Sequence, residues 1–229
     1  MKFGVVVFPG SNCDDDAVDA LRDQLKQDVV KLWHKDHDLQ GCDFIILPGG
    51  FSYGDYLRTG AVARFSPIMN EVIKHAERGG YLMGICNGFQ ILAEARLVPG
   101  VLLRNTNQKY VCKNIYLRPQ SKSVLLTAGL DDRAYKIPIA HGEGRYFIDA
   151  DTLNELNDND QIIFRYCDEA GNITDEANPN GSLDNIAGVA NERKNVFGLM
   201  PHPERAADSL LGNTDGRLIL EQLLNTVLV

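Results

Sequence analysis

The chain has 229 residues, of which 44% are hydrophobic and 24% charged, and its formal net charge is −8 at pH 7. This composition is typical of a globular protein with a sizeable apolar core, and we expect a single domain over residues 1–229. The acidic balance, without any lysine- or arginine-rich run, excludes nucleic acid as an expected partner.

The N-terminal segment MKFGVVVFPG carries one lysine and a short apolar run before Pro9. That run is too short for the core of a signal peptide and far too short to span a membrane, so we expect a cytoplasmic protein without membrane contact. The cysteines lie at wide spacings with no CxxC or Cys/His pair, which predicts reduced thiols and no metal site. They are Cys13, Cys42, Cys86, Cys112 and Cys167.

The first half of the chain alternates short apolar runs with helical periodicity, which is typical of a parallel sheet covered by helices on both faces. Strands are predicted at KFGVVVF (2–8), VVKLW (29–33), DFIILP (43–48) and YLMGI (81–85). Helices are predicted from the acidic residues 14–16 onward, from Val62 to the Gly79-Gly80 stop, and directly after Cys86.

The second half has a different pattern. The segments KNIYL, KSVLLT, RYFI and QIIFRY are separated by polar turns and predict antiparallel strands. NIAGVAN and NVFGLMP are again typical of buried strands, and GRLILEQLLNTVL predicts a helix that packs on the sheet. The expected class is therefore α/β, with a mostly parallel central sheet flanked by helices and antiparallel strands in the second half. No GxxxxGK[ST] phosphate loop occurs in the sequence, so we do not expect ATP chemistry in this chain.

The segment GICNG places Cys86 between two glycines where a buried strand ends and a helix begins. This is the pattern of a nucleophile elbow, because a corner residue lifted above the sheet needs small neighbours two positions away on either side. The N–H groups at the start of the helix would point towards the thiol and favour its ionised, nucleophilic form. A buried cysteine in a turn whose glycines serve only packing remains the alternative.

The segment PHPE places His202 and Glu204 two positions apart after a buried strand. Side chains at this spacing can point the same way, so Glu204 can hold one ring nitrogen of His202 while the other faces a thiol. The flanking prolines equally allow a rigid surface turn with a solvated histidine and glutamate. His141 and Glu143 in AHGEGR have the same spacing, which makes His141 a rival base.

Two glycines, Gly49 and Gly50, close the strand DFIILP, and a corner of this kind can aim backbone N–H groups at a developing oxyanion. With this third element the chain resembles the class I (triad) glutamine amidotransferases. Their motifs PGG, GxCxGxQ and HxE occur here in that order, at residues 49–50, 84–90 and 202–204. The resemblance implies a flavodoxin-like fold and favours His202 over His141 as the base.

The resemblance also implies roles for individual residues. Cys86 would attack the carboxamide of glutamine, His202 would pass a proton to the leaving ammonia, and Glu204 would orient His202. Backbone N–H groups of Gly50 and Asn87 would form the oxyanion hole.

Three further sites are implied around this centre. Gln90 would help to hold the substrate glutamine. His141 and Arg145 would lie on a flexible glycine-containing loop at the mouth of the active site or at a partner interface. We also expect the loop FSYGDYLRTG, directly after Gly50, to sense a docked partner through Tyr53, Asp55 or Arg58.

Within the family, the segments GGFSYGDYLRTGAVARFS, ICNGFQIL, IAHGEGRY, NPNGS and PHPERA are most similar to the glutaminase subunits of phosphoribosylformylglycinamidine synthase, an enzyme of purine (IMP) biosynthesis. That similarity implies that ammonia passes to a separate large synthetase subunit, which uses Mg-ATP to convert formylglycinamide ribonucleotide to formylglycinamidine ribonucleotide. It also implies a small accessory subunit. No cofactor is implied for this chain itself.

Other functions remain open from the residues alone. The chain can be the glutaminase subunit of another amidotransferase, or a stand-alone cysteine hydrolase of the DJ-1 type, which lacks the HxE pair near the end of the sequence. A non-catalytic binding module would keep the fold without needing Cys86. Release of ammonia from glutamine would separate the amidotransferases from the other two classes.

Overall fold

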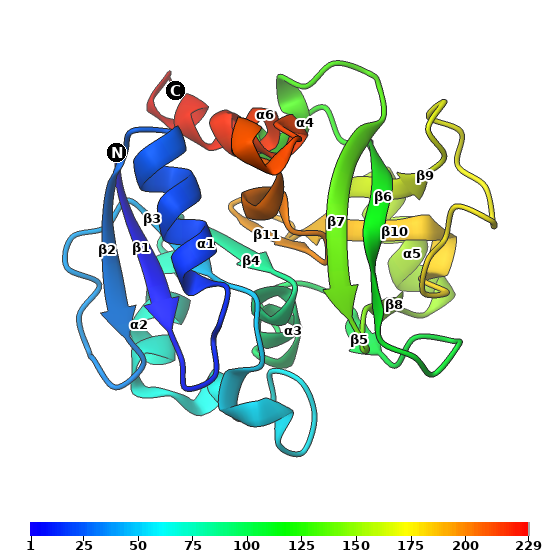
Figure 1. The fold of residues 1–229 in the computed structure, drawn as a ribbon. Coiled ribbons are helices and arrows are strands. Elements are labelled where there is room, and N and C mark those ends of the chain that lie inside the picture. The colour runs from blue at the N-terminus through cyan, green and yellow to red at the C-terminus, as the bar shows by residue number, and fades with distance from the viewer. Residues whose placement is uncertain (229) are drawn as a thin grey trace.

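The computed structural model describes residues 1–228, which contain a nine-stranded sheet with helices on both faces (Figure 1). Five neighbouring strands are parallel, in the order β2 (Asp28–Trp33), β1 (Lys2–Val7), β3 (Phe44–Leu47), β4 (Tyr81–Ile85) and β11 (Val196–Leu199). The sheet continues with antiparallel strands β10 (Ile186–Ala190), β9 (Ile162–Cys167), β6 (Val111–Pro119) and β7 (Tyr135–His141). The predicted α/β class is confirmed.

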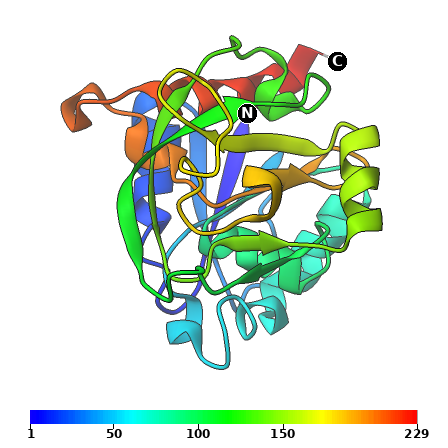
Figure 2. The same ribbon diagram turned by 90° about the vertical axis from the view of Figure 1, so that its right-hand side faces the viewer.

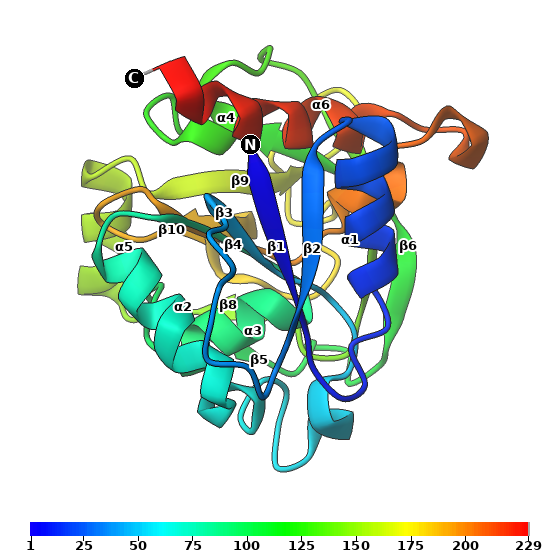
Figure 3. The same cartoon turned by 90° about the vertical axis from the view of Figure 1, so that its left-hand side faces the viewer.

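The parallel strands form because their apolar runs can be covered on both faces. α1 (Asp14–Asp19), which continues as a π-helical turn over Ala20–Gln24, lies on one side of the strands. α2 (Pro67–Glu77) and α3 (Asn87–Glu94) lie on the other side, as the edge-on view in Figure 3 shows. All four residues of β3 are consequently buried, as expected for an interior strand of such a sheet.

The strand order also fixes where a site can form. The chain leaves β1 towards β2 on one side, and β3 pairs on the other side of β1, so the connections at the carboxyl ends of these strands diverge. Open α/β sheets bind ligands in the crevice that such a divergence creates. The loop ends that follow β1, β3, β4 and β11 meet at this edge and carry Cys13, Gly49-Gly50, Cys86 and His202.

The helix predicted from Val62 begins later than expected. Ala63–Phe65 forms a short 3-10 turn, Ser66 is extended with φ −61° and ψ 141°, and Pro67 is the first helical residue. Proline disfavours the helical conformation in the residue before it and is well suited to the first position of a helix, so it sets the boundary here. The predicted stop at Gly79-Gly80 is confirmed, since α2 ends at Glu77.

The second half contains one prediction that is wrong. KSVLLT does not form a strand, because α4 (Leu125–Ala128) occupies its end. The Ser121 hydroxyl oxygen accepts hydrogen bonds from the backbone N–H groups of Ser123 and Val124, which turns the chain into this helix. The helix α6 (Asp215–Glu221), continued by a 3-10 helix over Gln222–Leu228, agrees with the helix predicted there.

Several elements were not predicted from the sequence. β7 alternates buried and less buried residues but carries Pro138 in its middle, which is tolerated because β7 is an edge strand. α5 (Ala150–Asp158) begins at Asp149, whose side chain accepts a hydrogen bond from the Thr152 N–H. Figure 2 shows α5 standing at the end of β9. A small separate sheet pairs β5 (Val101–Leu103), which was also not predicted, with β8 (Arg145–Phe147), which lies within the predicted strand RYFI.

Curvature of the sheet brings its far edge back towards the parallel strands. β6 and β7 run across β9 and β10 at a steep angle in Figure 1. The backbone N–H of His202, just after β11, donates to the Pro138 carbonyl of β7 at 2.9 Å. The edge strand therefore closes one side of the crevice. Over residues 1–228, no helix combines the length and apolar character that crossing a bilayer requires.

Candidate active site

Cys86 occupies a sharp corner between β4 and α3. Its backbone has φ 50° and ψ −104°, a sparsely populated conformation for a residue with a side chain. A Cβ at Gly84 would lie 2.6 Å from the Gly88 carbonyl carbon, and a Cβ at Gly88 would collide with the Leu47 carbonyl oxygen. Both glycines are thus required for close packing, and the strained corner they permit costs about 1–3 kcal/mol, as is common at functional sites.

The Cys86 thiol is buried at the start of α3, and its Sγ lies 3.8 Å from the Ala140 carbonyl oxygen of β7. The first N–H groups of a helix have no partner within the helix and carry a partial positive charge. They therefore provide an electropositive setting for a thiolate and for any oxyanion formed next to it.

His202 and Glu204 form a buried pair after β11. His202 Nδ1 lies 2.6 Å from Glu204 Oε1, and the two residues are 1% and 4% exposed. A solvated surface turn is therefore wrong for this segment. Among the residues that the structure describes, neither His202 Nε2 nor Glu204 Oε2 has a hydrogen-bond partner of acceptable geometry.

Opposing effects act on the charge of His202. Burial lowers the pKa of His202, but the negative charges of Glu204 and Cys86 outweigh it and raise that pKa to about 10. An imidazole in this setting holds a proton readily once Cys86 is ionised. The structure thus brings Cys86, His202 and Glu204 together, with Nδ1 facing the carboxylate and Nε2 left for the thiol or a substrate.

The glycine corner after β3 lies directly against this group. A Cβ at Gly49 would lie 2.7 Å from His202 Cε1, and a Cβ at Gly50 would lie 2.6 Å from the Asn12 backbone nitrogen. Gly50 also has φ +123°, which side chains rarely adopt. Across residues 1–228, the backbone N–H groups of Gly50 and Asn87 make no hydrogen bond, so both remain available to an oxyanion.

Gln90 joins α3 to the turn that follows β7. Its Nε2 donates to the Glu143 carbonyl oxygen at 2.6 Å, and its Oε1 accepts from Asn87 Nδ2 at 3.0 Å. The Asn87 side chain in turn accepts from the Ser52 backbone N–H at 3.2 Å, which ties α3 to the loop after β3. The predicted substrate-binding residue therefore stands where three segments of the site meet.

The placement of His141 on a flexible loop is wrong. His141 is the last residue of β7 and is 3% exposed, because the edge strand extends further than its glycine-rich sequence suggests. Burial, together with the nearby charge of His202, lowers the pKa of His141 to about 4. Glu143 bonds to the Thr59 hydroxyl at 2.9 Å, and within residues 1–228 no hydrogen bond joins it to the ring of His141, so the rival pair lacks an oriented base. Arg145, at the start of β8, is half-buried.

We expect His141 to make the fold sensitive to acid. An unfolded histidine takes up a proton below its ordinary pKa of 6.5, whereas His141 in the folded chain stays neutral down to about 4. Protons therefore favour the unfolded state, and this residue should lower the free energy of unfolding by about 3 kcal/mol between pH 7 and pH 4. Urea unfolding of wild type and His141→Gln at both pH values measures this contribution. Equal losses in the two proteins would contradict it.

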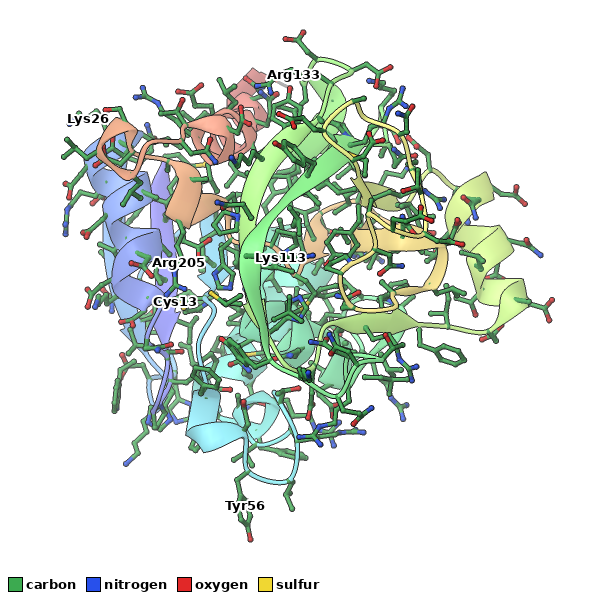
Figure 4. The ribbon with its side chains drawn as sticks, turned by 45° about the vertical axis from the view of Figure 1, so that its right-hand side comes forward. Cys13, Lys26, Tyr56, Lys113, Arg133 and Arg205 are labelled. Carbon is green, nitrogen blue, oxygen red and sulfur yellow. The ribbon has the colours of Figure 1, made fainter. Side chains whose placement is uncertain are left out.

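Behind the triad lie further residues that no sequence pattern indicated. Cys13 lies next to it, 3.3 Å from the position of a Cβ on Gly49, and Arg205 Nη2 lies 3.2 Å from its Sγ (Figure 4). Arg205 also donates to Asp16 at 2.9 Å. Burial raises the pKa of Cys13 to about 12, so this thiol stays neutral. The chain separation of these residues explains why no motif connects them.

The same group has the spacing of a metal site. Donor atoms of Cys13, His202 and Glu204 lie within 4.8 Å of one another. The Cys13 thiol is protonated, however, and His202 Nδ1 already bonds to Glu204, so the arrangement favours proton transfer over metal binding. A cavity of about 900 Å³ lies at the other end of α3, where Glu94 and Arg96 line it, and no triad residue contributes to it.

Comparisons with known proteins agree with this geometry. The CobB/CobQ-like glutamine amidotransferase domain matches residues 1–217. A phosphoribosylformylglycinamidine synthase subunit PurQ from Koribacter versatilis is 54% identical over 228 residues, covering 99% of each chain. The subunit of the same name from Salinibacter ruber is 56% identical over 227 residues, covering 99% of this chain and 97% of the relative. The solved structure of PurLQS from Thermotoga maritima matches with a TM-score of 0.85 at 43% identity, covering 99% of this chain and 98% of that one.

Proposed function

Because the chain belongs to the CobB/CobQ-like glutamine amidotransferase family, we propose that it is the glutamine-hydrolysing subunit of a phosphoribosylformylglycinamidine synthase, an enzyme of purine biosynthesis. One observation carries the chemistry: the strained corner at Cys86 lies beside a buried His202–Glu204 pair, so that the charge of Cys86 helps to raise the pKa of His202. The family match also argues against a stand-alone hydrolase of the DJ-1 type.

In the first step Cys86 attacks the side-chain amide of glutamine. The Sγ–C bond forms as the carbonyl oxygen takes up negative charge. The unpaired N–H groups of Gly50 and Asn87 support a role for both as donors to that oxyanion. One well-aimed donor of this kind contributes about 2.7–4 kcal/mol to stabilising the transition state.

His202 moves the proton. Its Nε2 takes the proton of the Cys86 thiol and then gives it to the amide nitrogen of the tetrahedral intermediate, so that ammonia leaves and a thioester remains. Glu204 holds Nδ1–H at 2.6 Å and offsets the positive charge of the imidazolium, in accord with the raised pKa of His202.

The second half of the reaction regenerates the enzyme. His202 takes a proton from water, the resulting hydroxide adds to the thioester carbon, and collapse of that intermediate breaks the S–C bond to release glutamate. Gln90, at the junction of α3 and the turn after β7, would hold the substrate throughout. The proposed reaction in this chain needs no cofactor.

The released ammonia needs an acceptor outside this chain. The match to the solved structure of PurLQS supports a multisubunit assembly. We propose that this chain delivers ammonia to an ATP-dependent synthetase subunit, which uses Mg-ATP to convert formylglycinamide ribonucleotide to the amidine, with a small accessory subunit in the complex. The absence of a phosphate-loop motif from this sequence is consistent with that division.

Reconstitution tests the proposed function. The chain is mixed with the synthetase and accessory subunits, formylglycinamide ribonucleotide, Mg-ATP and glutamine, and both glutamate and the amidine are followed. Coupled formation of the two products supports the proposal. Glutamate without amidine would point to a glutaminase subunit of another amidotransferase, and no glutamate would point to a non-catalytic binding module.

The isolated chain is expected to be a poor glutaminase, with turnover rising at least about tenfold when the partner subunits and nucleotide ligands are added, since one realigned oxyanion donor is sufficient for such a gain. The loop after Gly50 has positive φ at Tyr53, Asp55 and Leu57, so it is strained next to a proposed donor. Its tip is exposed, with Tyr56 at 71% projecting from the molecule (Figure 4).

Not every residue of that loop is free to respond. The Tyr53 hydroxyl bonds to His34 and Ser66 inside the molecule, so it anchors the loop, and Arg58 bonds to Glu94 at 2.8 Å. The exposed tip at Tyr56 and Leu57 is better placed to contact a partner, whereas Asp55 is half-buried. Steady-state glutamate release with and without the partner measures the effect, and a free subunit that already turns over at the rate of the complex would show a preassembled site.

A further inference from the structure

The turn Gly142–Gly144 lies between β7 and β8, beside the Cys86 corner, and two buried side-chain amides hold it. We propose that Asn105 and Asn180 are positioning residues that fix this turn in the geometry needed to bind glutamine. The inference rests on the proposed glutaminase function. Neither asparagine belongs to the motifs that identify the triad.

Asn105 forms hydrogen bonds with the turn from one side. Its Oδ1 accepts from the Gly144 N–H at 3.1 Å, and its Nδ2 donates to the His141 carbonyl at 2.9 Å. The backbone N–H of Asn105 donates to the Gly142 carbonyl at 3.0 Å. The residue is completely buried, so water cannot replace these bonds if the amide is removed.

Asn180 forms a hydrogen bond with the turn from the opposite side. Its Nδ2 donates to the Gly144 carbonyl at 2.9 Å, while its Oδ1 accepts from the Ser182 N–H at 3.0 Å. These two contacts fix the orientation of the amide, because a flipped group would set its oxygen against the Gly144 carbonyl. Asn180 is also buried, and its Nδ2 lies 3.5 Å from Nε2 of His141.

The segment that carries Asn180 is itself stabilised by hydrogen bonds. In NPNGS, the Asn178 side-chain oxygen accepts from the N–H groups of Gly181 and Ser182 at 2.9 and 3.1 Å. The Asn180 backbone carbonyl accepts from the N–H of Thr106, the residue after Asn105, at 3.0 Å. The contact between Thr106 and Asn180 joins two segments that lie 74 positions apart in the chain. The two asparagines therefore belong to one rigid support.

Gly144 depends on these amides, because the other hydrogen bonds of the turn are made by Gly142 and Glu143. Gly142 and Gly144 have no side chains to pack. Within residues 1–228, the backbone N–H and carbonyl of Gly144 bond to the Asn105 and Asn180 side chains and to no other group. Regular strand pairing resumes only at Arg145, in the short β8.

The position of the turn matters to the proposed site because its backbone faces the substrate-binding side of α3. The Glu143 carbonyl accepts from Gln90 Nε2 at 2.6 Å. The Ala140 carbonyl, just before the turn, lies 3.8 Å from Cys86 Sγ. A turn released from Asn105 and Asn180 would shift the Glu143 carbonyl and leave Gln90 misplaced, while the triad itself would stay assembled.

The test is Asn180→Asp, which keeps the shape of the side chain but places an acceptor oxygen against the Gly144 carbonyl. In the reconstituted complex we expect KM for glutamine to rise at least about tenfold, with ammonia-dependent amidine formation within about twofold of wild type. Asn195→Asp is the matched control. Asn195 is also buried and its Nδ2 also donates to two carbonyls, those of Ala76 and Gly80, at the opposite end of the sheet.

Further variants and a second measurement distinguish a local effect on the turn from misfolding of the chain. Asn105→Ala and Asn180→Ala should both speed hydrogen exchange of the Gly144 amide in the isolated chain, whereas Asn195→Ala should leave it unchanged. An unaltered KM in Asn180→Asp, or a KM equal to that of the control, would overturn the inference. So would unchanged exchange at Gly144. Wild-type protein that fails to hydrolyse glutamine would instead refute the proposed function, since exchange at Gly144 can be measured without activity.

Discussion

Replacing Cys86 by alanine is expected to abolish glutamine-dependent amidine formation by the complex, while ammonia-dependent formation survives. Loss of a nucleophile lowers kcat on the order of 10⁴-fold or more, because the oxyanion donors alone cannot form the thioester. Added ammonia bypasses the thioester and reaches the synthetase directly. Amidine formation with glutamine and with ammonium chloride, measured on the same preparation, gives both rates.

Cys13 supplies the matched control for this experiment. It is buried beside His202, but burial raises the pKa of its thiol to about 12, so this thiol stays neutral and is a poor nucleophile. Cys13→Ala should therefore retain glutamine-dependent activity. Loss of that activity in Cys13→Ala and not in Cys86→Ala would show that Cys86 is not the nucleophile. Loss of both glutamine- and ammonia-dependent rates in Cys86→Ala would reject the division of labour between subunits.

His202→Ala is expected to cost more than Glu204→Gln. In the proposed mechanism His202 transfers protons in both halves of the reaction, so its loss should lower the glutamine-dependent rate on the order of 10⁴-fold or more. Glu204→Gln keeps the shape beside Nδ1 but removes the buried charge that favours the imidazolium, and a loss on the order of 10²–10⁴-fold is expected. Rates of glutamate release by the complex, followed from pH 5 to pH 9, measure both effects.

The pH profile distinguishes a loss of the effect of Glu204 on His202 from misfolding of the Glu204→Gln variant. With Glu204 neutralised, the pKa of His202 should fall, because the charge of Glu204 helps to raise it. His37→Ala, at an exposed position away from the site, is the control and should behave as wild type. Equal and small losses in His202→Ala and Glu204→Gln would mean that another group is the base, and His141 would then be the first residue to examine.

The sequence by itself determined the parts of this protein that depend on local chemistry. Apolar runs bounded by glycine and proline predicted the parallel strands, since a strand covered on both faces needs continuous apolar residues. The glycines around Cys86 predicted a tight corner, and the structure shows why no side chain fits at Gly84 or Gly88. The i, i+2 spacing of His202 and Glu204 allowed one to face the other, and the resemblance to the amidotransferases favoured this pair over His141 and Glu143.

Local patterns failed where a contact with a distant segment decided the outcome. KSVLLT has the composition of a strand, but hydrogen bonds from the Ser121 and Ser123 side chains to Asp160 hold its start in a turn. His141 is followed by glycines that suggested a loop, yet it ends a strand that pairs along β6 and closes over Cys86.

Only the tertiary structure decided which residues surround the triad. Cys13 and Arg205 lie 192 positions apart but touch behind His202, and Asn105 and Gly144 are 39 apart but share a buried hydrogen bond. No periodicity or motif records such pairs, because their geometry follows from the strand order and from the curvature that brings β7 back to β11. The proposed nucleophile and base lie in short sequence motifs, whereas the contacts that support them depend on the curvature of the whole sheet.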